Sequence, residues 1–192
     1  MNWANRLTLS RLVMTIVFVV VLNSRWSYGR TASLIIFIVA GITDYFDGEI
    51  ARRYETVTNF GKLMDPLVDK VMTAAAFICL VPFGAIPAWV ATTVVARDFL
   101  ITGLRLLAST RGLVLPAERL GKHKTSWQIG TILFFLLLLS ARELNYADAG
   151  SPWWGHAWDQ GGVTLISIMV ALTIYSGLGY AWRHRAVIAS EE

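Results

Sequence analysis

Four aspartates stand in two pairs at the borders of long apolar stretches. Asp44 and Asp47 are three residues apart in TDYFDGEIARR, and Asp65 and Asp69 are four apart in GKLMDPLVDK. Side chains three or four residues apart share one face of a helix. A charge at membrane depth costs about 2.5–3.5 kcal/mol even on the lenient insertion scale, so it normally faces a cavity or a partner. Four such charges need one common explanation.

Divalent metal ions supply that explanation. Carboxylates that converge without a cation repel each other, and oxygen-only ligands favour a hard ion such as Mg²⁺ or Mn²⁺ over zinc. Four carboxylates suit two ions, and two ions a few ångströms apart suit a displacement at phosphorus. The alternative is a set of helix-end charges that pair with the nearby cations Arg52, Arg53, Lys62 and Lys70.

The chain that must position these aspartates has the composition of a membrane protein. Of its 192 residues, 55% belong to the apolar set AVILMFWYC and only 16% are charged, with a mean hydropathy of +0.54. Soluble domains are about 25% charged. The numbers therefore argue against a soluble globular enzyme and exclude a disordered chain.

Six apolar stretches are long enough to cross about 30 Å of hydrocarbon as helices. They cover roughly residues 7–23, 31–53, 61–82, 86–108, 125–141 and 163–183. We therefore predict an all-α fold, a polytopic membrane bundle of six transmembrane helices that forms one domain over residues 1–192. Residues 142–162 are predicted to be a connection.

The flanks of these stretches predict the orientation of the bundle. Lys and Arg are concentrated on the side that carries both termini, which places that side in the cytoplasm. At about 1.5 Å per residue, Asp44 and Asp69 lie roughly 13 and 12 Å from the cytoplasmic ends of their spans. The two aspartate pairs can therefore converge in a polar cavity on the cytoplasmic side.

Written as one string, this region is Asp44-x2-Asp47-Gly48-x2-Ala51-Arg52-x8-Gly61-x3-Asp65-x3-Asp69. The string resembles the signature of the CDP-alcohol phosphotransferase family at all eight fixed positions. The resemblance implies a six-helix membrane enzyme, usually a homodimer. In such an enzyme an alcohol attacks the β-phosphate of a CDP-linked donor and CMP is released.

The same resemblance implies roles for individual residues. Two divalent ions, Mg²⁺ or Mn²⁺, would be held by Asp44, Asp47, Asp65 and Asp69, and Asp69 would also act as the general base. The CDP group would lie against Gly48, Arg52 and Gly61. Thr8 would join that CDP site, because the opening segment Asn5-x2-Thr8-x2-Arg11 also resembles the family.

Basic residues in and after the fourth stretch predict the acceptor. Arg97 is about 15 Å deep, Arg105 lies near the mouth, and Lys122 and Lys124 open the fifth stretch. Cations that converge beside a metal site suggest an acceptor that carries a phosphate. The alternative is that Arg97 pairs with Asp98 while the loop cations bind anionic lipid.

Residues 96–128 also resemble the corresponding stretch of the phosphatidylglycerophosphate synthases in that family. The matching residues are Arg97-Asp98, Gly103-x-Arg105 and Gly121-Lys122-x-Lys124-Thr125, although many relatives have Glu at the position of Asp98. The resemblance implies CDP-diacylglycerol as donor. It also implies sn-glycerol 3-phosphate as acceptor, bound by Arg97, Arg105, Lys122 and Lys124.

The expected partners are these two substrates, membrane lipids and a second copy of the chain, with no nucleic acid. The expected location is the inner membrane, with the active site and both termini on the cytoplasmic side. Other interpretations stay open at this point. They are the same chemistry with inositol phosphate or serine as acceptor, an aspartate-rich intramembrane prenyltransferase, and a cation transporter.

Overall fold

The structure is a computed structural model that describes the backbone of residues 3–53, 59–110, 119–146 and 152–183. Side chains are described within 9–43, 67–68, 70–109, 124–146, 153–180 and 182–183. All regular secondary structure in these ranges is helical. The predicted all-α fold class is confirmed.

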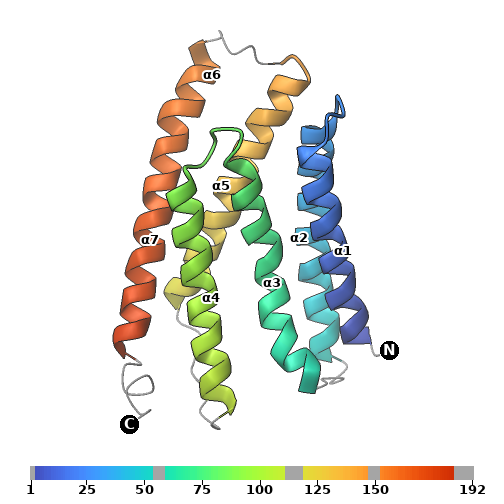
Figure 1. Ribbon diagram of the computed structural model, residues 1–192, viewed down its shortest axis with the longest axis vertical. Coiled ribbons are helices and arrows are strands. Elements are labelled where there is room, and N and C mark those ends of the chain that lie inside the picture. The colour runs from blue at the N-terminus through green and yellow to red at the C-terminus, as the bar shows by residue number, and fades with distance from the viewer. Residues whose placement is uncertain (1–2, 54–58, 111–118, 147–151, 184–192) are drawn as a thin grey trace.

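Six long helices make up most of the described chain (Figure 1). Each has 21–25 residues, which corresponds to roughly 32–37 Å at 1.5 Å per residue and matches the thickness of a bilayer core. The six predicted stretches are therefore confirmed as helices. Their bounds are α1 (Trp3–Asn23), α2 (Gly29–Arg53), α3 (Asn59–Leu80), α4 (Ala88–Thr110), α5 (Arg119–Glu143) and α7 (Gly162–Arg183).

The predicted connection 142–162 is wrong in its second half, which is helical. A short α6 (Pro152–His156) leads into a π-helical turn, η1 (Ala157–Gly161), and from there directly into α7. Proline is favoured at a first helical position, and packing then stabilises the segment. Trp154 stacks on Trp158 with ring centroids 4.9 Å apart, and a Cβ at Gly162 would lie 2.9 Å from Phe135 Cζ. Gly162 therefore serves close helix packing here.

The long helices run alternately up and down, so that the start of α1 and the end of α7 lie at one end of the bundle (Figure 1). We call this the terminal end, and we call the opposite end, with the turns 24–28 and 81–87, the turn end. Helix α1 packs against α2 and α3, α5 packs against α2 and α7, and α4 lies between α3 and α7. The residues of α4 are therefore in reach of both neighbours.

The side chains sort into a core and an apolar outer surface. Phe18, Phe77, Phe135 and Met169 are fully buried at the centre of one cluster, while Ile16, Val20, Leu100 and Leu178 are among the exposed apolar residues. Exposed apolar surface of this extent marks contact with a partner or a membrane. Two described segments, Lys124–Glu143 and Trp153–Tyr180, are long and apolar enough to cross a membrane. The apolar part is shorter in Leu9–Asn23, Gly29–Thr43 and Lys70–Leu80.

Glu143 at the end of α5 holds the start of α2 at the turn end. Its carboxylate accepts hydrogen bonds from the backbone N–H groups of Arg30 (3.1 Å) and Thr31 (2.8 Å) and from the Thr31 hydroxyl (2.7 Å). These N–H groups belong to the first turn of α2, where no intrahelical acceptor exists. A side chain from another helix therefore serves as the cap, which ties α5 to α2.

We predict that Glu143→Ala destabilises the protein by about 1–2 kcal/mol, the usual cost of losing a helix cap. The measurement is the apparent Tm of the protein purified in detergent. The control is Asp159→Ala, which removes an exposed acid near the same end. An equal change in Tm for both variants would contradict the capping role.

Candidate functional site

The carboxylate of Asp98, on α4, is the centre of a buried polar network. Asp98 is only 7% exposed, and its Oδ1 pairs with Lys124 Nζ and accepts a hydrogen bond from Arg97 Nη1 at 3.1 Å. Gln128 Nε2 donates to the other oxygen, Oδ2, at 3.3 Å. Lys124 and Gln128 are four residues apart, so α5 presents both from one face. One carboxylate thus binds three side chains from two helices.

Lys70 connects this network to α3. Its Nζ donates to the backbone oxygen of Asp98 at 3.1 Å and also to the hydroxyl of Thr102, which in turn donates to the same backbone oxygen at 2.7 Å. Lys70 directly follows Asp69 in the sequence. The helix that carries two of the signature aspartates is therefore fixed against α4 next to Asp98.

The Arg97 side chain packs against helix α7. Arg97 Nη2 donates to Ser176 Oγ at 3.0 Å, and that hydroxyl donates to the Thr173 carbonyl at 3.2 Å. A Cβ at Gly177 would lie only 3.0 Å from Arg97 Cγ. The absence of a side chain at Gly177 thus allows Arg97 to lie flat against α7.

Charge in this network is unbalanced among the described side chains. Lys70, Arg97 and Lys124 contribute three cations, while Asp98 contributes one carboxylate. Arg105 lies on the same face of α4, seven residues after Asp98. Buried charge is costly unless it is paired. Cationic groups at this depth suit the binding of an anion.

The structure brings together some of the sequence-predicted acceptor residues. Arg97 and Lys124 meet on Asp98, which confirms the Arg97–Asp98 pair that was the alternative expectation. Helix α5 begins at Arg119, so Lys124 is a buried helical residue, 2% exposed, and is not part of a loop. The helix starts early because Arg, Leu and Lys are good helix formers and outweigh Gly121. The side chain of Lys122, also on α5, lies outside the described residues.

The signature residues occupy helices at the terminal end. Asp44, Asp47, Gly48 and Arg52 belong to the second half of α2, Gly61, Asp65 and Asp69 to the first half of α3, and Thr8 to the start of α1. Their side chains lie outside the described residues, and so does the predicted cavity on this side. Within the described part, no group of three or more His, Cys, Asp or Glu side chains could hold a metal. Carboxylates one turn apart on two helices are a donor set that fits hard divalent ions.

Asp98 was expected only as the alternative partner of Arg97, and five further residues of the network were not among the predicted site residues. These five are Lys70, Thr102, Gln128, Ser176 and Gly177. The sequence could have indicated Lys70 and Gln128, since a charged or amide side chain inside an apolar stretch normally faces a partner. Nothing in the sequence indicated Ser176 and Gly177, because small residues are frequent in any packed membrane helix.

Comparison with known proteins identifies the family. A sequence model of the CDP-alcohol phosphatidyltransferase family matches residues 1–175. The chain therefore belongs to the CDP-alcohol phosphatidyltransferase family, whose members generally depend on divalent metal ions. Together with the two membrane-length segments, this membership makes the chain a membrane protein.

Several relatives carry names that specify a reaction. A Bacillus subtilis (strain 168) protein named "CDP-diacylglycerol–glycerol-3-phosphate 3-phosphatidyltransferase" is 39% identical over 148 residues, 71% of this chain and 77% of that protein. A Mycobacterium tuberculosis (strain ATCC 25618 / H37Rv) protein named "Probable phosphatidylglycerophosphate synthase" is 37% identical over 95% of this chain and 81% of its own length. A Rickettsia typhi protein with the same name as the first is 31% identical over 93% of this chain and 94% of its own length.

We predict that Asp98→Asn destabilises the fold by about 3–5 kcal/mol, because it leaves buried Lys124 and Arg97 without a counter-charge. The measurement is the apparent Tm in detergent, together with the yield of monodisperse protein. The control is Asp98→Glu, which keeps the charge and is expected to lie much closer to the wild type. An Asn variant as stable as the wild type would show that Asp98 is not the required counter-ion.

Proposed function

We propose that this protein transfers the phosphatidyl group from CDP-diacylglycerol to sn-glycerol 3-phosphate, giving phosphatidylglycerophosphate and CMP. The observation that carries the proposal is the buried network around Asp98, whose cations lie beside the helix of Asp65 and Asp69. An acceptor with a phosphate group matches that charge. The names of the relatives from Bacillus subtilis and Rickettsia typhi support the same donor and acceptor.

The phosphate group of the acceptor binds to cations that Asp98 and α7 hold in place. Arg97 and Lys124 form its inner partners, and Arg105 and Lys122 lie toward the terminal end of α4 and at the start of α5. Asp98 holds two of these cations before the substrate arrives, so little reorganisation is needed on binding. Lys70 fixes the position of α4 relative to Asp69, because its ammonium group spans the two helices.

The aspartates of α2 and α3 supply the chemistry at the donor. Asp44, Asp47, Asp65 and Asp69 hold two divalent ions, Mg²⁺ or Mn²⁺, which when bound neutralise the diphosphate of the donor. Asp69 accepts the proton from the primary hydroxyl of the acceptor. That oxygen forms a bond to the β-phosphorus, and the bond to the bridging oxygen breaks as CMP leaves. Gly48, Arg52, Gly61 and Thr8 surround the CDP group.

The proposed orientation places the terminal end in the cytoplasm. All six long helices then cross the inner membrane, and both termini and the site face the compartment that holds the soluble acceptor. The diacyl tails of the donor lie sideways in the bilayer. A second copy of the chain completes a homodimer.

The test is CMP release from CDP-diacylglycerol with four acceptors in parallel. We predict turnover with glycerol 3-phosphate, little with inositol phosphate, and none with serine or free glycerol, because the last two carry no phosphate for the cations around Asp98. Faster turnover with serine would contradict the acceptor assignment. A lack of CMP release with every acceptor would contradict the reaction.

We predict that Asp65→Asn and Asp69→Asn each abolish turnover while the protein stays folded, because each removes one of the four carboxylate ligands. Chelation is expected to stop the wild-type reaction, and Mg²⁺ or Mn²⁺ to restore it. Ca²⁺ is expected to serve poorly, since it takes more ligands at longer distances. CMP release and the apparent Tm are measured side by side, and near wild-type turnover of either variant would contradict the two-metal assignment.

We predict that Gly177→Ala raises the KM for glycerol 3-phosphate and leaves the KM for CDP-diacylglycerol unchanged. The added Cβ would lie 3.0 Å from Arg97 Cγ and displaces that side chain. A misplacement of about 1 Å can cost up to roughly 100-fold in rate. The matched control is Gly179→Ala, two residues along α7, where an added Cβ meets nothing within 4 Å. Equal kinetics of the two variants would show that α7 does not position Arg97.

A further inference from the structure

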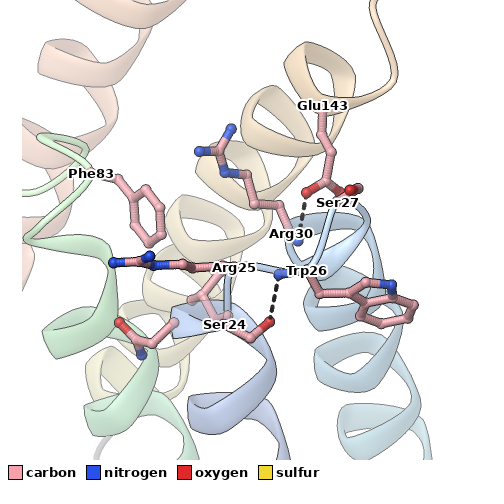
Figure 2. Close-up of a pocket in the computed structure, with 10 residues that line it drawn as sticks. Ser24, Arg25, Trp26, Ser27, Arg30, Phe83 and Glu143 are labelled. Carbon is pink, nitrogen blue, oxygen red and sulfur yellow. Dashed lines mark hydrogen bonds between the residues drawn. The ribbon is translucent and has the colours of Figure 1, made fainter.

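A cavity of about 340 Å³ lies at the turn end (Figure 2). The parts of α2 and α3 that carry the signature aspartates lie toward the other end of the bundle (Figure 1). The walls of the cavity come from the turn between α1 and α2, the turn after α3 and the end of α5. The lining includes Arg25, Trp26, Arg30, Phe83 and Glu143. Figure 2 shows the side chains of Arg25 and Arg30 extending toward Phe83, and the Arg30 guanidinium lies 5.5 Å from the centre of that ring.

The cavity has an excess of positive charge. Its one carboxylate, Glu143, already accepts three hydrogen bonds at the start of α2, from the backbone of Arg30 and from the backbone and hydroxyl of Thr31. Within the described residues, neither Arg25 nor Arg30 forms an ion pair. Two guanidinium groups thus face one cavity whose acid is engaged with the backbone.

The surroundings of the cavity have the character of a lipid headgroup region. Trp26 and Tyr28 are more than half exposed and pack edge to face at 6.5 Å, and aromatic residues of this kind gather at membrane interfaces. Below them, α1 exposes the apolar side chains of Val13, Ile16, Val17 and Val20. A molecule with its phosphate in the cavity can therefore lay its acyl chains along α1.

We infer that this cavity binds the phosphodiester headgroup of an anionic phospholipid. Arg25 and Arg30 bind the phosphate oxygens, because guanidinium groups match phosphate geometry. A choline headgroup is disfavoured, because its quaternary ammonium would bring a third positive charge beside Arg25 and Arg30. The carboxylate that lines the cavity, Glu143, is engaged with the start of α2. The inference does not depend on the proposed reaction, since none of these residues belongs to the proposed catalytic site.

The test is lipid binding to the full-length protein in detergent, followed by native mass spectrometry. The probes are phosphatidylglycerol, phosphatidylcholine and inorganic phosphate, titrated separately. The variant is Arg25→Gln combined with Arg30→Gln, which keeps the α2 cap because Glu143 binds the backbone of Arg30. The matched control is Arg142→Gln, which removes another arginine of the turn end that stacks on Trp154 at 5.6 Å and does not line the cavity.

We expect the wild type and Arg142→Gln to bind one more phosphatidylglycerol than the double variant at the same concentration. The affinity of the double variant for phosphatidylglycerol is expected to be roughly 30-fold lower, because two arginines that attract an anionic lipid are lost. CMP release is expected to stay at the wild-type level in the double variant. Equal phosphatidylglycerol binding by the double variant and the control would overturn the inference. Equal binding of phosphatidylcholine, or tight binding of inorganic phosphate that the double variant abolishes, would also overturn it.

Discussion

The burial of one carboxylate among several cations is the constraint on which the rest of this structure depends. Asp98 on α4 binds Arg97 and, from α5, Lys124 and Gln128 through its carboxylate. Its backbone oxygen accepts a hydrogen bond from Lys70 of α3, and Arg97 in turn contacts Ser176 of α7. Ion pairs in such surroundings offset their own desolvation only when the geometry is good. The four helices must therefore meet in one arrangement for Asp98 to be tolerated, and that arrangement also holds Arg97 and Lys124 in place.

The same network links the helix of the proposed donor site to the helices of the proposed acceptor site. Helix α3 carries two signature aspartates and, one residue further, Lys70, which donates to the backbone of Asp98. Helix α7 carries no signature residue, yet Ser176 and Gly177 determine where the Arg97 guanidinium lies. Hydrogen bonds thus connect α3, which carries two of the proposed metal ligands, and α7 to the segment of α4 that carries Arg97 and Asp98. A change on α7 is expected to affect the acceptor while leaving the donor alone.

The sequence predicted the helices well because hydropathy and length decide them. It also offered the Arg97–Asp98 pair as the alternative to a phosphate-binding role, and the pair is present. The phosphate-binding roles of Arg97 and Lys124 remain predictions. The sequence missed the helical segment 152–161, because aromatic packing between Trp154 and Trp158 outweighs its glycines. It missed Ser176 and Gly177 because their role depends on the approach of α4, and residue type alone does not report such a contact. The roles of the four aspartates remain a prediction from the signature.

The most direct test of the central claim is equilibrium binding of glycerol 3-phosphate to the metal-free protein, measured by calorimetry with chelator present. If the cations on Asp98 form a preset phosphate site, the wild type binds glycerol 3-phosphate without metal and binds free glycerol far more weakly. Arg97→Ala then binds glycerol 3-phosphate about 10- to 150-fold more weakly, the range expected for one charge-assisted hydrogen bond. An unchanged affinity in Arg97→Ala, or equal binding of glycerol, would contradict the account.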